Sequence, residues 1–402
     1  MTGRSPACEL DLGAPEFVVD PYPFFARARS STPIGWHEQT QTWLILNHAM
    51  CSQVLRGRAF ARLWRDREPT ATFEPFNILH RNQMMENEPP AHTRLRRKVS
   101  TAFARGHVER VRPRVRELGS ELLDQAPDAF DALSHYAEPL PVLVIAELLG
   151  APTSDHALLR EWSQAIVRMY EPSISGEVEQ AALDASRDFG DYMRALVAAR
   201  RTTRRGDLLS DLIEAQDGGD GLTDDEVLAS AILLLNAGHE ASVNVFGNGL
   251  VALLRRPEQW DRLVGGEVPV ALAVEEMLRF DSALQLFERT ATRDVVIGDV
   301  RVSAGEKVAV LLGAANRDPE AFERPDDMDI ARDPNPHLAF GAGVHFCLGA
   351  PLARVELAES LALLVRRHPD LTLAAEPRRK PTFVLRGYDS VPVTGKERRR
   401  HG

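Results

Sequence analysis

The sequence predicts a mainly α-helical fold with small β-sheets, and three observations carry that prediction. Helical periodicity dominates from residue 92 to about 170, and a long apolar run with helix signals covers 224–255. Strand-like patterns are confined to short segments, such as "TWLILN" at 42–47 and the glycine-broken stretch 288–312. Strands and helices do not alternate as they do in a parallel α/β sheet.

Composition places limits on the class of protein. The 402 residues are 44% hydrophobic, which suffices for a sizeable core. We predict a single domain over 1–402, with a loose tail at 1–15 and a polar tail at 395–402. The formal net charge of −10 argues against nucleic acid or an anionic membrane as the main partner. No signal-peptide core or run of 18 apolar residues is visible, so we expect a soluble, cytoplasmic monomer.

The first ninety residues contain two short predicted helices around a strand. The helices are expected at 21–30 and 47–57, and the strand between them at 42–47. Residues 60–90 mix aromatic side chains with polar residues and prolines, without a clear period. We interpret them as a long loop, which in a compact domain is usually functional.

The clearest helix in the sequence covers residues 224–255. Thr223 is the expected N-cap, and Glu226 three residues later completes a capping box. Pro257 marks the end. About 30 residues at 1.5 Å each span roughly 45 Å, the width of a domain. Both faces are largely apolar, so this helix is expected to run through the interior.

The remaining elements follow from the same patterns. A helix is predicted at 270–280, followed by short strands with glycine turns over 288–312. Residues 315–340 are expected to form a loop. A further helix should begin after a glycine-rich stretch and end near residue 368, before a strand-rich C-terminal region.

One of the three cysteines lies in that glycine-rich stretch, "FGAGVHFCLGAPLAR" at 340–354. Cys8 and Cys51 are expected to be buried apolar residues, and no CxxC pair suggests zinc or a disulfide framework. Cys347 differs, because glycines flank it and a helix is predicted to begin just after it. The amides and the dipole of that helix N-terminus are expected to lower the thiol pKa and to stabilise a thiolate.

A thiolate can act as a nucleophile or as a metal ligand. A nucleophile needs a base, and His345, two residues away, would project to another side of a bent loop. The stretch lacks the third glycine of a dinucleotide-binding motif. Haem ligation fits better, because a cysteine thiolate on haem iron favours O–O cleavage. A glycine-lined loop can shield the sulfur, supply amide donors and set its distance from the iron.

The cysteine loop resembles that of a known family. Phe340, Gly343, Cys347 and Gly349 fit the spacing F-x-x-G-x-x-x-C-x-G of the haem-binding loop of cytochromes P450, in the form typical of soluble bacterial members. The resemblance extends from about Asp20 to residue 387. It implies the cytochrome P450 fold, haem b bound through Cys347, and a monooxygenase that uses O2 to hydroxylate or otherwise oxidise a small or medium-sized hydrophobic substrate.

Further motifs occur in the family's order. Glu276 and Arg279 resemble its E-x-x-R pair, which can lock a loop by hydrogen bonds. "AGHEAS" at 237–242 resembles the distal-helix motif, and "EPPAHTRLRRKVSTAF" at 88–103 resembles the helix that contacts the haem propionates. The residues that the resemblance places beside the cofactor are His92, Arg96, Arg289, His345, Gly238, Phe340 and Gly349. His92 and Arg96, four apart, would share one helix face.

The distal-helix motif departs from the family at one position. The family usually has an acid followed by threonine, a pair that relays protons, whereas this chain has Glu240 followed by Ala241. Alanine can neither donate nor relay a proton. Three interpretations compete. Ser242 or an ordered water takes over the relay; a substrate hydroxyl does so; or the enzyme carries out chemistry that depends less on it, such as oxidative coupling or a peroxide-driven reaction.

The resemblance also suggests how substrate and electrons reach the site. The pocket would be lined by 60–88, 165–185, 283–287 and 382–386, together with Leu233, Leu234 and Ala237 of the long helix. Ala283 replaces a common family proline, and Arg386 and Glu288 are candidates to anchor a polar group. Electrons are expected from a separate ferredoxin and its reductase. The candidate docking residues are Arg94, Arg97 and Lys98.

Overall fold

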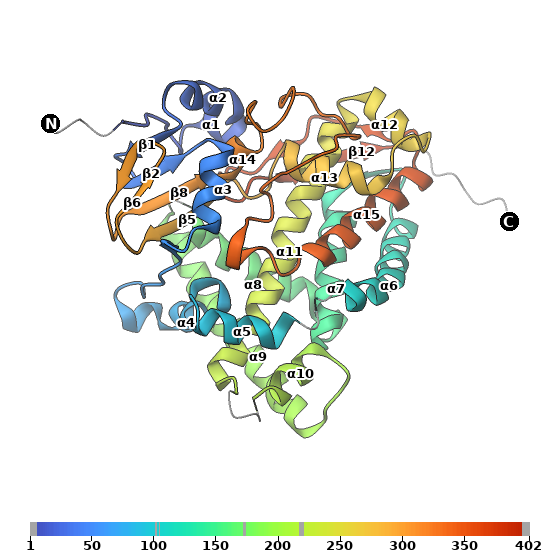
Figure 1. The fold of residues 1–402 in the computed structure, drawn as a ribbon. Helices are drawn as coiled ribbons and strands as arrows, with labels where there is room; N and C mark the ends of the chain where they lie inside the picture. Colours follow the sequence, from blue (N-terminus) through green and yellow to red (C-terminus); the bar gives the residue numbers. More distant parts are fainter. Residues whose placement is uncertain (1–5, 101–102, 104, 172–173, 217–220, 396–402) are drawn as a thin grey trace.

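The structure of this chain is a computed structural model, which describes residues 6–100, 103, 105–171, 174–216 and 221–395. Its helices are α1 (Pro15–Val19), α2 (Tyr22–Ser31), α3 (His48–Arg56), α4 (Thr70–Arg81), α5 (Ala91–Ser100), α6 (Arg105–Asp124), α7 (Pro139–Leu149), α8 (His156–Val167), α9 (Gly176–Thr202), α10 (Leu208–Glu214), α11 (Asp224–Leu254), α12 (Pro257–Val264), α13 (Val270–Phe280), α14 (Leu312–Ala315) and α15 (Ala350–Arg367). Most of the chain is helical, as predicted (Figure 1).

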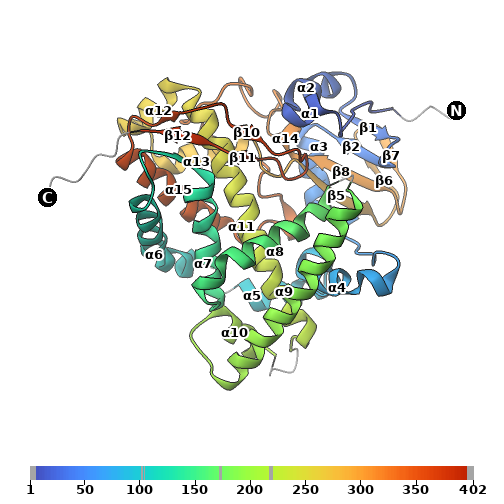
Figure 2. The same ribbon diagram turned by 180° about the vertical axis from the view of Figure 1, so that it is seen from behind.

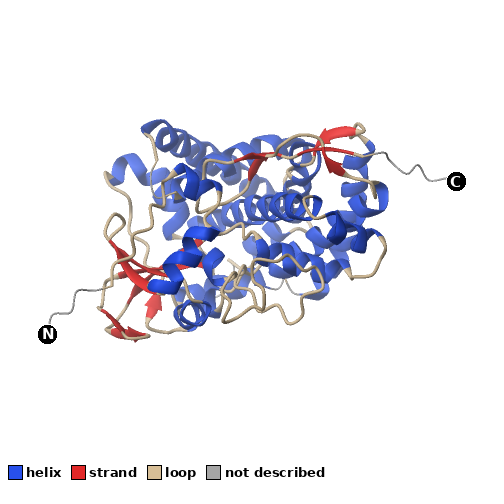
Figure 3. Ribbon diagram, turned by 90° about the horizontal axis from the view of Figure 1, so that it is seen from above, coloured by secondary structure: helices blue, strands red, loops and turns tan. Residues whose placement is uncertain are grey.

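The strands are short and form small sheets. They are β1 (Ile34–His37), β2 (Thr42–Ile45), β3 (Phe60–Ala61), β4 (Ala129–Asp131), β5 (Leu286–Ala291), β6 (Val295–Ile297), β7 (Val300–Val302), β8 (Lys307–Leu311), β9 (Thr372–Leu373), β10 (Arg378–Arg379), β11 (Tyr388–Ser390) and β12 (Pro392–Thr394). The largest sheet has the order β1-β2-β8-β5-β3, with β2 and β8 parallel. Figure 3 shows the strands gathered at two ends of the molecule, with helices between them.

Helix α11 is the central element, as the sequence predicted. Thr223 Oγ1 accepts a hydrogen bond from the Glu226 amide at 3.2 Å, and the Glu226 carboxylate accepts one from the Thr223 amide at 2.9 Å. This capping box begins the helix, which ends at Leu254. Helices α4, α7, α8, α9 and α13 all contact α11, so both of its faces are buried for most of its length.

Two predictions about the N-terminal part of the chain are wrong. Residues 60–90 are not one loop, because they contain β3, α4 and a short helix at Met84–Glu86. Pro75 inside α4 obscured the helical spacing of Phe73, Phe76 and Leu79, which are buried.

The predicted loose tail at 1–15 is also wrong from residue 6 onward. Ala7 forms a parallel bridge with Trp36, and Cys8, Leu10 and Leu12 are buried. Alternating apolar residues let this segment cover an edge of the core, beside the largest sheet. Residues 1–5 lie outside the described residues, as do 396–402 of the predicted polar tail. In the part of the chain that the structure describes, no helix combines the length and apolar character needed to cross a membrane.

Candidate functional site

The loop around Cys347 has a backbone that glycine alone allows. Gly341 and Gly343 have φ values of 67° and 73°, in the left-handed region. A Cβ at Gly343 would in addition overlap the backbone oxygen of Leu55. The Cys347 amide donates to the Phe340 carbonyl at 3.0 Å and closes the loop. These contacts fix where the sulfur lies, just before the first turn of α15.

The electrostatic surroundings of Cys347 differ from the sequence-based expectation. Burial raises the pKa of the thiol, and this effect exceeds the opposing contributions of the Gly349 amide, the Arg96 guanidinium and the Ala350 amide. The expectation that the loop alone lowers the pKa is therefore wrong, because desolvation outweighs the helix N-terminus. A coordinating metal cation removes the proton outright, so the loop is suited to a thiolate that is formed on metal binding.

Helix α11 has an accessible turn in the middle of its buried length. Ala237 is exposed, and Gly238 and Ala241 are half-exposed, while Asn236, His239, Glu240 and Ser242 are buried. The two alanines are four residues apart and share one face. A Cβ at Gly238 would instead lie 3.5 Å from Ile145 of α7. Ala237, Gly238 and Ala241 together therefore make the accessible part of this turn.

The accessible turn and the cysteine loop belong to elements that meet. Figure 1 shows the start of α15, which follows Cys347, lying against the middle of α11, and the two helices are in contact. Figure 2 shows α7 and α8 on the opposite side of α11. Helix α11 is thus flanked by the start of α15 on one side and by α7 and α8 on the other.

The four predicted propionate contacts converge from three elements. His92 and Arg96 lie on α5, Arg289 on β5 and His345 in the cysteine loop. The ring centroids of His92 and His345 are 4.6 Å apart, and Arg96 Nη2 donates to the Phe346 carbonyl at 2.8 Å. The prediction that His92 and Arg96 share a face toward the cysteine loop agrees with this geometry.

This cluster holds more positive charge than the protein balances. Arg289 is 3% exposed, and no described residue accepts a hydrogen bond from its Nη2. Burial, with repulsion from Arg62, lowers the pKa of Arg289 to about 9. Burial together with His345 and Arg96 lowers the pKa of His92 to about 4. A buried guanidinium with an unmet donor requires an anion, and the two carboxylates of a haem satisfy that requirement.

Glu88 is part of this cluster and was missed by the sequence reasoning. His345 Nε2 and Glu88 Oε1 are 2.8 Å apart, and the same oxygen accepts a hydrogen bond from the Arg62 amide at 2.7 Å. Burial raises the pKa of Glu88. The hydrogen bonds from His345 and from the Arg62 amide together lower it by more, so the net shift is downward. Its place in "ENEPPAHTR", four residues before His92, was the available signal.

Glu240 is hydrogen-bonded to Lys380, which lies 140 residues later in the sequence. Lys380 Nζ donates to Glu240 Oε1 at 2.6 Å and to Asn244 Oδ1 at 3.3 Å. Burial raises the pKa of Glu240, but Lys380 and His239, with the hydrogen bonds to the carboxylate, together lower it more, so the carboxylate stays ionised. Among the described residues nothing forms a hydrogen bond with Glu240 Oε2 or with either ring nitrogen of His239, and His239 Nδ1 lies 3.9 Å from Glu240 Oε2. Ser242 is 8% exposed, next to the half-exposed Ala241.

The E-x-x-R pair is fully buried and is not an ordinary surface ion pair. Arg279 donates through Nε and Nη2 to Glu276 at 2.8 and 2.7 Å, and both side chains are 0% exposed. Arg279 also donates hydrogen bonds to the backbone carbonyls of Asn316, Pro325 and Asp327. Glu276 accepts further hydrogen bonds from the side chains of Arg332 and Asn335. The pair fixes the segment that leads into the cysteine loop.

Comparison with known proteins agrees with this geometry. The family model described as Cytochrome P450 matches residues 155–264 and 270–382. The chain belongs to the cytochrome P450 family. It is 38% identical to cytochrome P450 monooxygenase PikC of Streptomyces venezuelae, over 98% of this chain and 96% of that protein. It is 36% identical to 6-deoxyerythronolide B hydroxylase of Saccharopolyspora erythraea, over 95% and 98%.

A solved structure shares the fold in detail. P450BioI, in complex with acyl carrier protein ligated to hexadec-9Z-enoic acid, superposes with a TM-score of 0.91 at 34% identity and covers 95% of this chain and 100% of that one. This P450 is accordingly an oxidoreductase of the monooxygenase type, and its cofactor is haem b. The mainly α-helical cytochrome P450 fold predicted from the sequence is confirmed.

Several residues that the sequence suggested for the P450 site are engaged elsewhere. Arg94 pairs with Glu226, which also caps α11. Glu288 pairs with Lys307 at 3.0 Å on the surface. Arg386 is buried and donates to Asp281 at 2.8 Å and to the Val18 and Val19 carbonyls. Arg94 is therefore committed to the fold, and neither Glu288 nor Arg386 is available to anchor a substrate.

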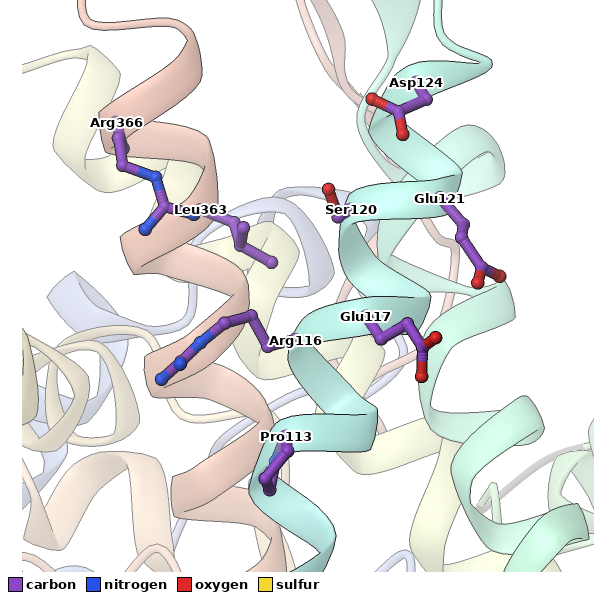
Figure 4. A pocket seen from close by; sticks show the side chains of 8 residues that line it. All are labelled: Pro113, Arg116, Glu117, Ser120, Glu121, Asp124, Leu363 and Arg366. Carbon is purple, nitrogen blue, oxygen red and sulfur yellow. The ribbon is translucent and has the colours of Figure 1, made fainter. Parts of the chain in front are cut away.

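A separate groove lies between α6 and α15. It measures about 380 Å³ and is lined by Pro113, Arg116, Glu117, Ser120, Glu121, Asp124, Leu363 and Arg366 (Figure 4). None of these residues belongs to the set predicted from the sequence. None of the residues that line the groove lies on α11.

Proposed function

We propose that this P450 holds haem iron through Cys347 and inserts one atom of O2 into a small or medium-sized hydrophobic organic substrate. The observation that carries the proposal is the accessible turn at Ala237 and Ala241, which α15 and the cysteine loop approach. When bound, a thiolate-ligated haem supplies the activation of O2. The protein supplies the ligand, the cations for the propionates and a mainly apolar chamber.

The proposed contacts to the cofactor follow from the residues described above. His92, Arg96, Arg289 and His345 would bind the propionates, because they converge from α5, β5 and the cysteine loop and Arg289 has an unmet donor. The carbonyl of Phe340 holds the Cys347 amide. A Cβ on Gly349 would lie 4.0 Å from the sulfur, so glycine keeps the approach to it open. Glu276 and Arg279 are assigned a structural role.

The proposed substrate is hydrophobic, since apolar residues occur on the segments that this proposal assigns to the substrate site. Leu233 and Leu234 precede Ala237 on α11, and Leu385 of the C-terminal segment is half-exposed. The relative P450BioI was solved with a hexadecenoic acid chain, which supports an apolar chamber. A screen of apolar compounds for haem spin-state shifts tests this assignment. A thiolate-type spectrum of the reduced protein under carbon monoxide, and substrate-dependent NADPH consumption with a ferredoxin and reductase, test the reaction class.

Introducing threonine at position 241 should change the fraction of consumed electrons that ends up in product rather than in hydrogen peroxide. Glu240 is held by Lys380 and Ser242 is buried, so Ala241 is the half-exposed residue among 240–242. In Ala241→Thr we expect haem binding to be unchanged and the ratio of product to hydrogen peroxide to change about two- to tenfold, less than the roughly 10²–10⁴-fold that a positioned acid or base typically contributes. The ratio is measured by product chromatography and a peroxide assay in the same reaction.

Ala241→Ser and Ala237→Ser provide the matched controls. The first adds a hydroxyl at the same position, and the second adds one to the same face one turn earlier. If Ala241→Thr leaves both product and peroxide unchanged, residue 241 does not belong to the relay.

A second candidate function, oxidative coupling or a peroxide-driven reaction, is favoured by the alanine itself. Labelled O2 separates the two, because coupling places no labelled oxygen in the product.

We propose that electrons come from a separate ferredoxin that docks on the cysteine side. Arg97 is exposed and Lys98 half-exposed on α5, and Val344 and Phe346 of the cysteine loop are 51% and 41% exposed. Arg97→Glu should slow reduction by an acidic ferredoxin about two- to tenfold at low salt and much less at high salt, because screening weakens surface charges. Stopped-flow reduction under carbon monoxide measures this. Arg187→Glu on α9, with the same charge change, should have no effect.

A further inference from the structure

Glu275 of α13 forms a doubly hydrogen-bonded ion pair beside the cysteine loop. Its carboxylate accepts hydrogen bonds from Arg354 Nε at 2.6 Å and from Arg354 Nη2 at 2.9 Å. Arg354 lies near the start of α15, the helix that follows Cys347. The two hydrogen bonds end on different carboxylate oxygens, and this parallel arrangement fixes both the position and the plane of the guanidinium.

His337, which precedes the cysteine loop, also holds Glu275. Its Nε2 lies 3.0 Å from Glu275 Oε2, and its Nδ1 accepts a hydrogen bond from the Ala339 amide at 3.3 Å. Because an amide can only donate, Nε2 carries the hydrogen and donates it to the carboxylate. Burial raises the pKa of Glu275, but the contacts with Arg354 and His337 together lower it by more, to about 2. Glu275 is therefore ionised at neutral pH and balances the charge of Arg354.

The guanidinium of Arg354 lies over the ring of Phe340 in the cysteine loop. The Arg354 Cζ atom is 4.6 Å from the ring centroid, which is the geometry of a cation–π contact. The ring of His337 also lies near Phe340, with the centroids 6.0 Å apart. The carbonyl of Phe340 accepts the hydrogen bond from the Cys347 amide. The partners of Glu275 therefore pack on the residue that closes the loop around the sulfur.

The charge of Arg354 acts on the sulfur of Cys347. Burial dominates and raises the pKa of this thiol, but the positive charges of Arg96 and Arg354 both oppose that effect and favour the thiolate. The carboxylate of Glu275 counteracts Arg354, because the two groups are in hydrogen-bonding contact and their fields partly cancel at a distance. Glu275 therefore determines how much of the positive charge of Arg354 acts on the sulfur.

We propose that Arg354 and Glu275 together set the reduction potential of the haem that Cys347 binds, with Arg354 raising the potential and Glu275 lowering it. One electron added to ferric haem adds one negative charge, so a nearby cation favours the reduced state and a nearby anion opposes it. The inference rests on the proposed function, because it requires Cys347 as the iron ligand. Both are positioning residues, which act through Phe340 and through their charge.

The test is a reductive titration of the haem-loaded protein with dithionite and redox mediators, followed by the absorption spectrum. No ferredoxin is present, so docking does not affect the result. Arg354→Gln removes the cation and should lower the equilibrium constant for one-electron reduction about three- to tenfold, a shift of about 30–60 mV toward negative potential at roughly 59 mV per factor of ten. Glu275→Gln leaves Arg354 uncompensated and should shift the potential by a similar amount in the positive direction.

Opposite signs in these two variants identify a charge effect, since a loosened loop would shift both in the same direction. Arg354→Lys and Glu275→Asp keep the charges while disturbing the paired hydrogen bonds, so each should stay within about twofold of the wild-type equilibrium constant. Glu359→Gln is the matched control on α15. It removes a carboxylate that pairs with Arg112 and Arg116 of α6, and it should also stay within about twofold of the wild type.

Shifts of the same sign in the two glutamine variants, or no shift in either, refute the inference. An Arg354→Lys protein whose potential moves as far as that of Arg354→Gln also refutes it. This pair of Arg354 variants decides the question even if Glu275→Gln does not fold. A wild-type protein that shows no thiolate-type haem spectrum would instead overturn the proposed haem site, and the inference with it.

Discussion

Replacing Cys347 by serine should abolish the thiolate-type spectrum of the reduced protein under carbon monoxide and reduce monooxygenase turnover at least about 100-fold. Losing a partner that merely orients a metal ligand typically costs 10–100-fold, and loss of the ligand itself costs more. A neutral hydroxyl cannot donate electron density as a thiolate does. The loop offers no substitute, because the backbone that positions the sulfur is set by Gly341 and Gly343.

The measurement is an absorption spectrum with a matched control. Cys8→Ala removes another buried thiol, from the N-terminal segment, and should leave the spectrum unchanged. Far-ultraviolet circular dichroism shows whether the Cys347→Ser protein is folded, which separates loss of the ligand from loss of the fold. A thiolate-type spectrum that persists in a folded Cys347→Ser protein would exclude Cys347 as the iron ligand.

Replacing Asp281 by alanine should give the largest loss of stability in the chain, about 3–5 kcal/mol in the free energy of unfolding. Its carboxylate accepts hydrogen bonds from Arg386 Nε at 2.8 Å, Arg379 Nη2 at 2.6 Å and Tyr22 Oη at 2.8 Å. Asp281 is 6% exposed. Removing one partner of a buried pair leaves an uncompensated charge, which accounts for the size of the effect. Denaturant unfolding followed by circular dichroism measures it.

The pH dependence of stability gives an independent check on Asp281. The two arginines and their hydrogen bonds outweigh burial and hold the pKa of Asp281 well below its ordinary value of 3.8. A depressed pKa stabilises the fold above the ordinary value, and that contribution is lost as the pH falls below it. The free energy of unfolding of Asp281→Asn should therefore depend less on pH than that of the wild type in this acid range. Asp294→Ala, at an exposed ion pair, should change stability by less than about 1 kcal/mol.

Local patterns in the sequence were enough to locate the central helix and the cysteine loop. The capping box at Thr223 and the apolar run that follows it place α11 within one residue of its observed end. The glycines around Cys347 indicate a bend near a cofactor, and the motif identifies the family before any coordinates are considered. Such features depend on residues within a few positions of one another, which is why a single sequence reveals them.

Where local signals conflict, the sequence was misleading. Pro75 interrupts the apolar spacing of α4. The helix nevertheless continues from Thr70 to Arg81, because Phe73, Phe76 and Leu79 pack in the core. The expectation of a lowered Cys347 pKa counted the helix N-terminus and omitted burial, which acts more strongly. Burial is a property of the packed chain, and no short segment of sequence reports it.

The sequence by itself determined the family and the central helix and led us to propose Cys347 as the cofactor ligand, because each rests on spacing along the chain. The tertiary structure alone decided which distant side chains meet: Lys380 with Glu240, Arg386 with Asp281, and Glu171 with the amides of 383–385. These partners lie 140, 105 and 212 residues apart. Their pairing depends on how whole elements pack, and charge and hydrogen-bonding capacity read from the sequence do not specify a partner at that separation.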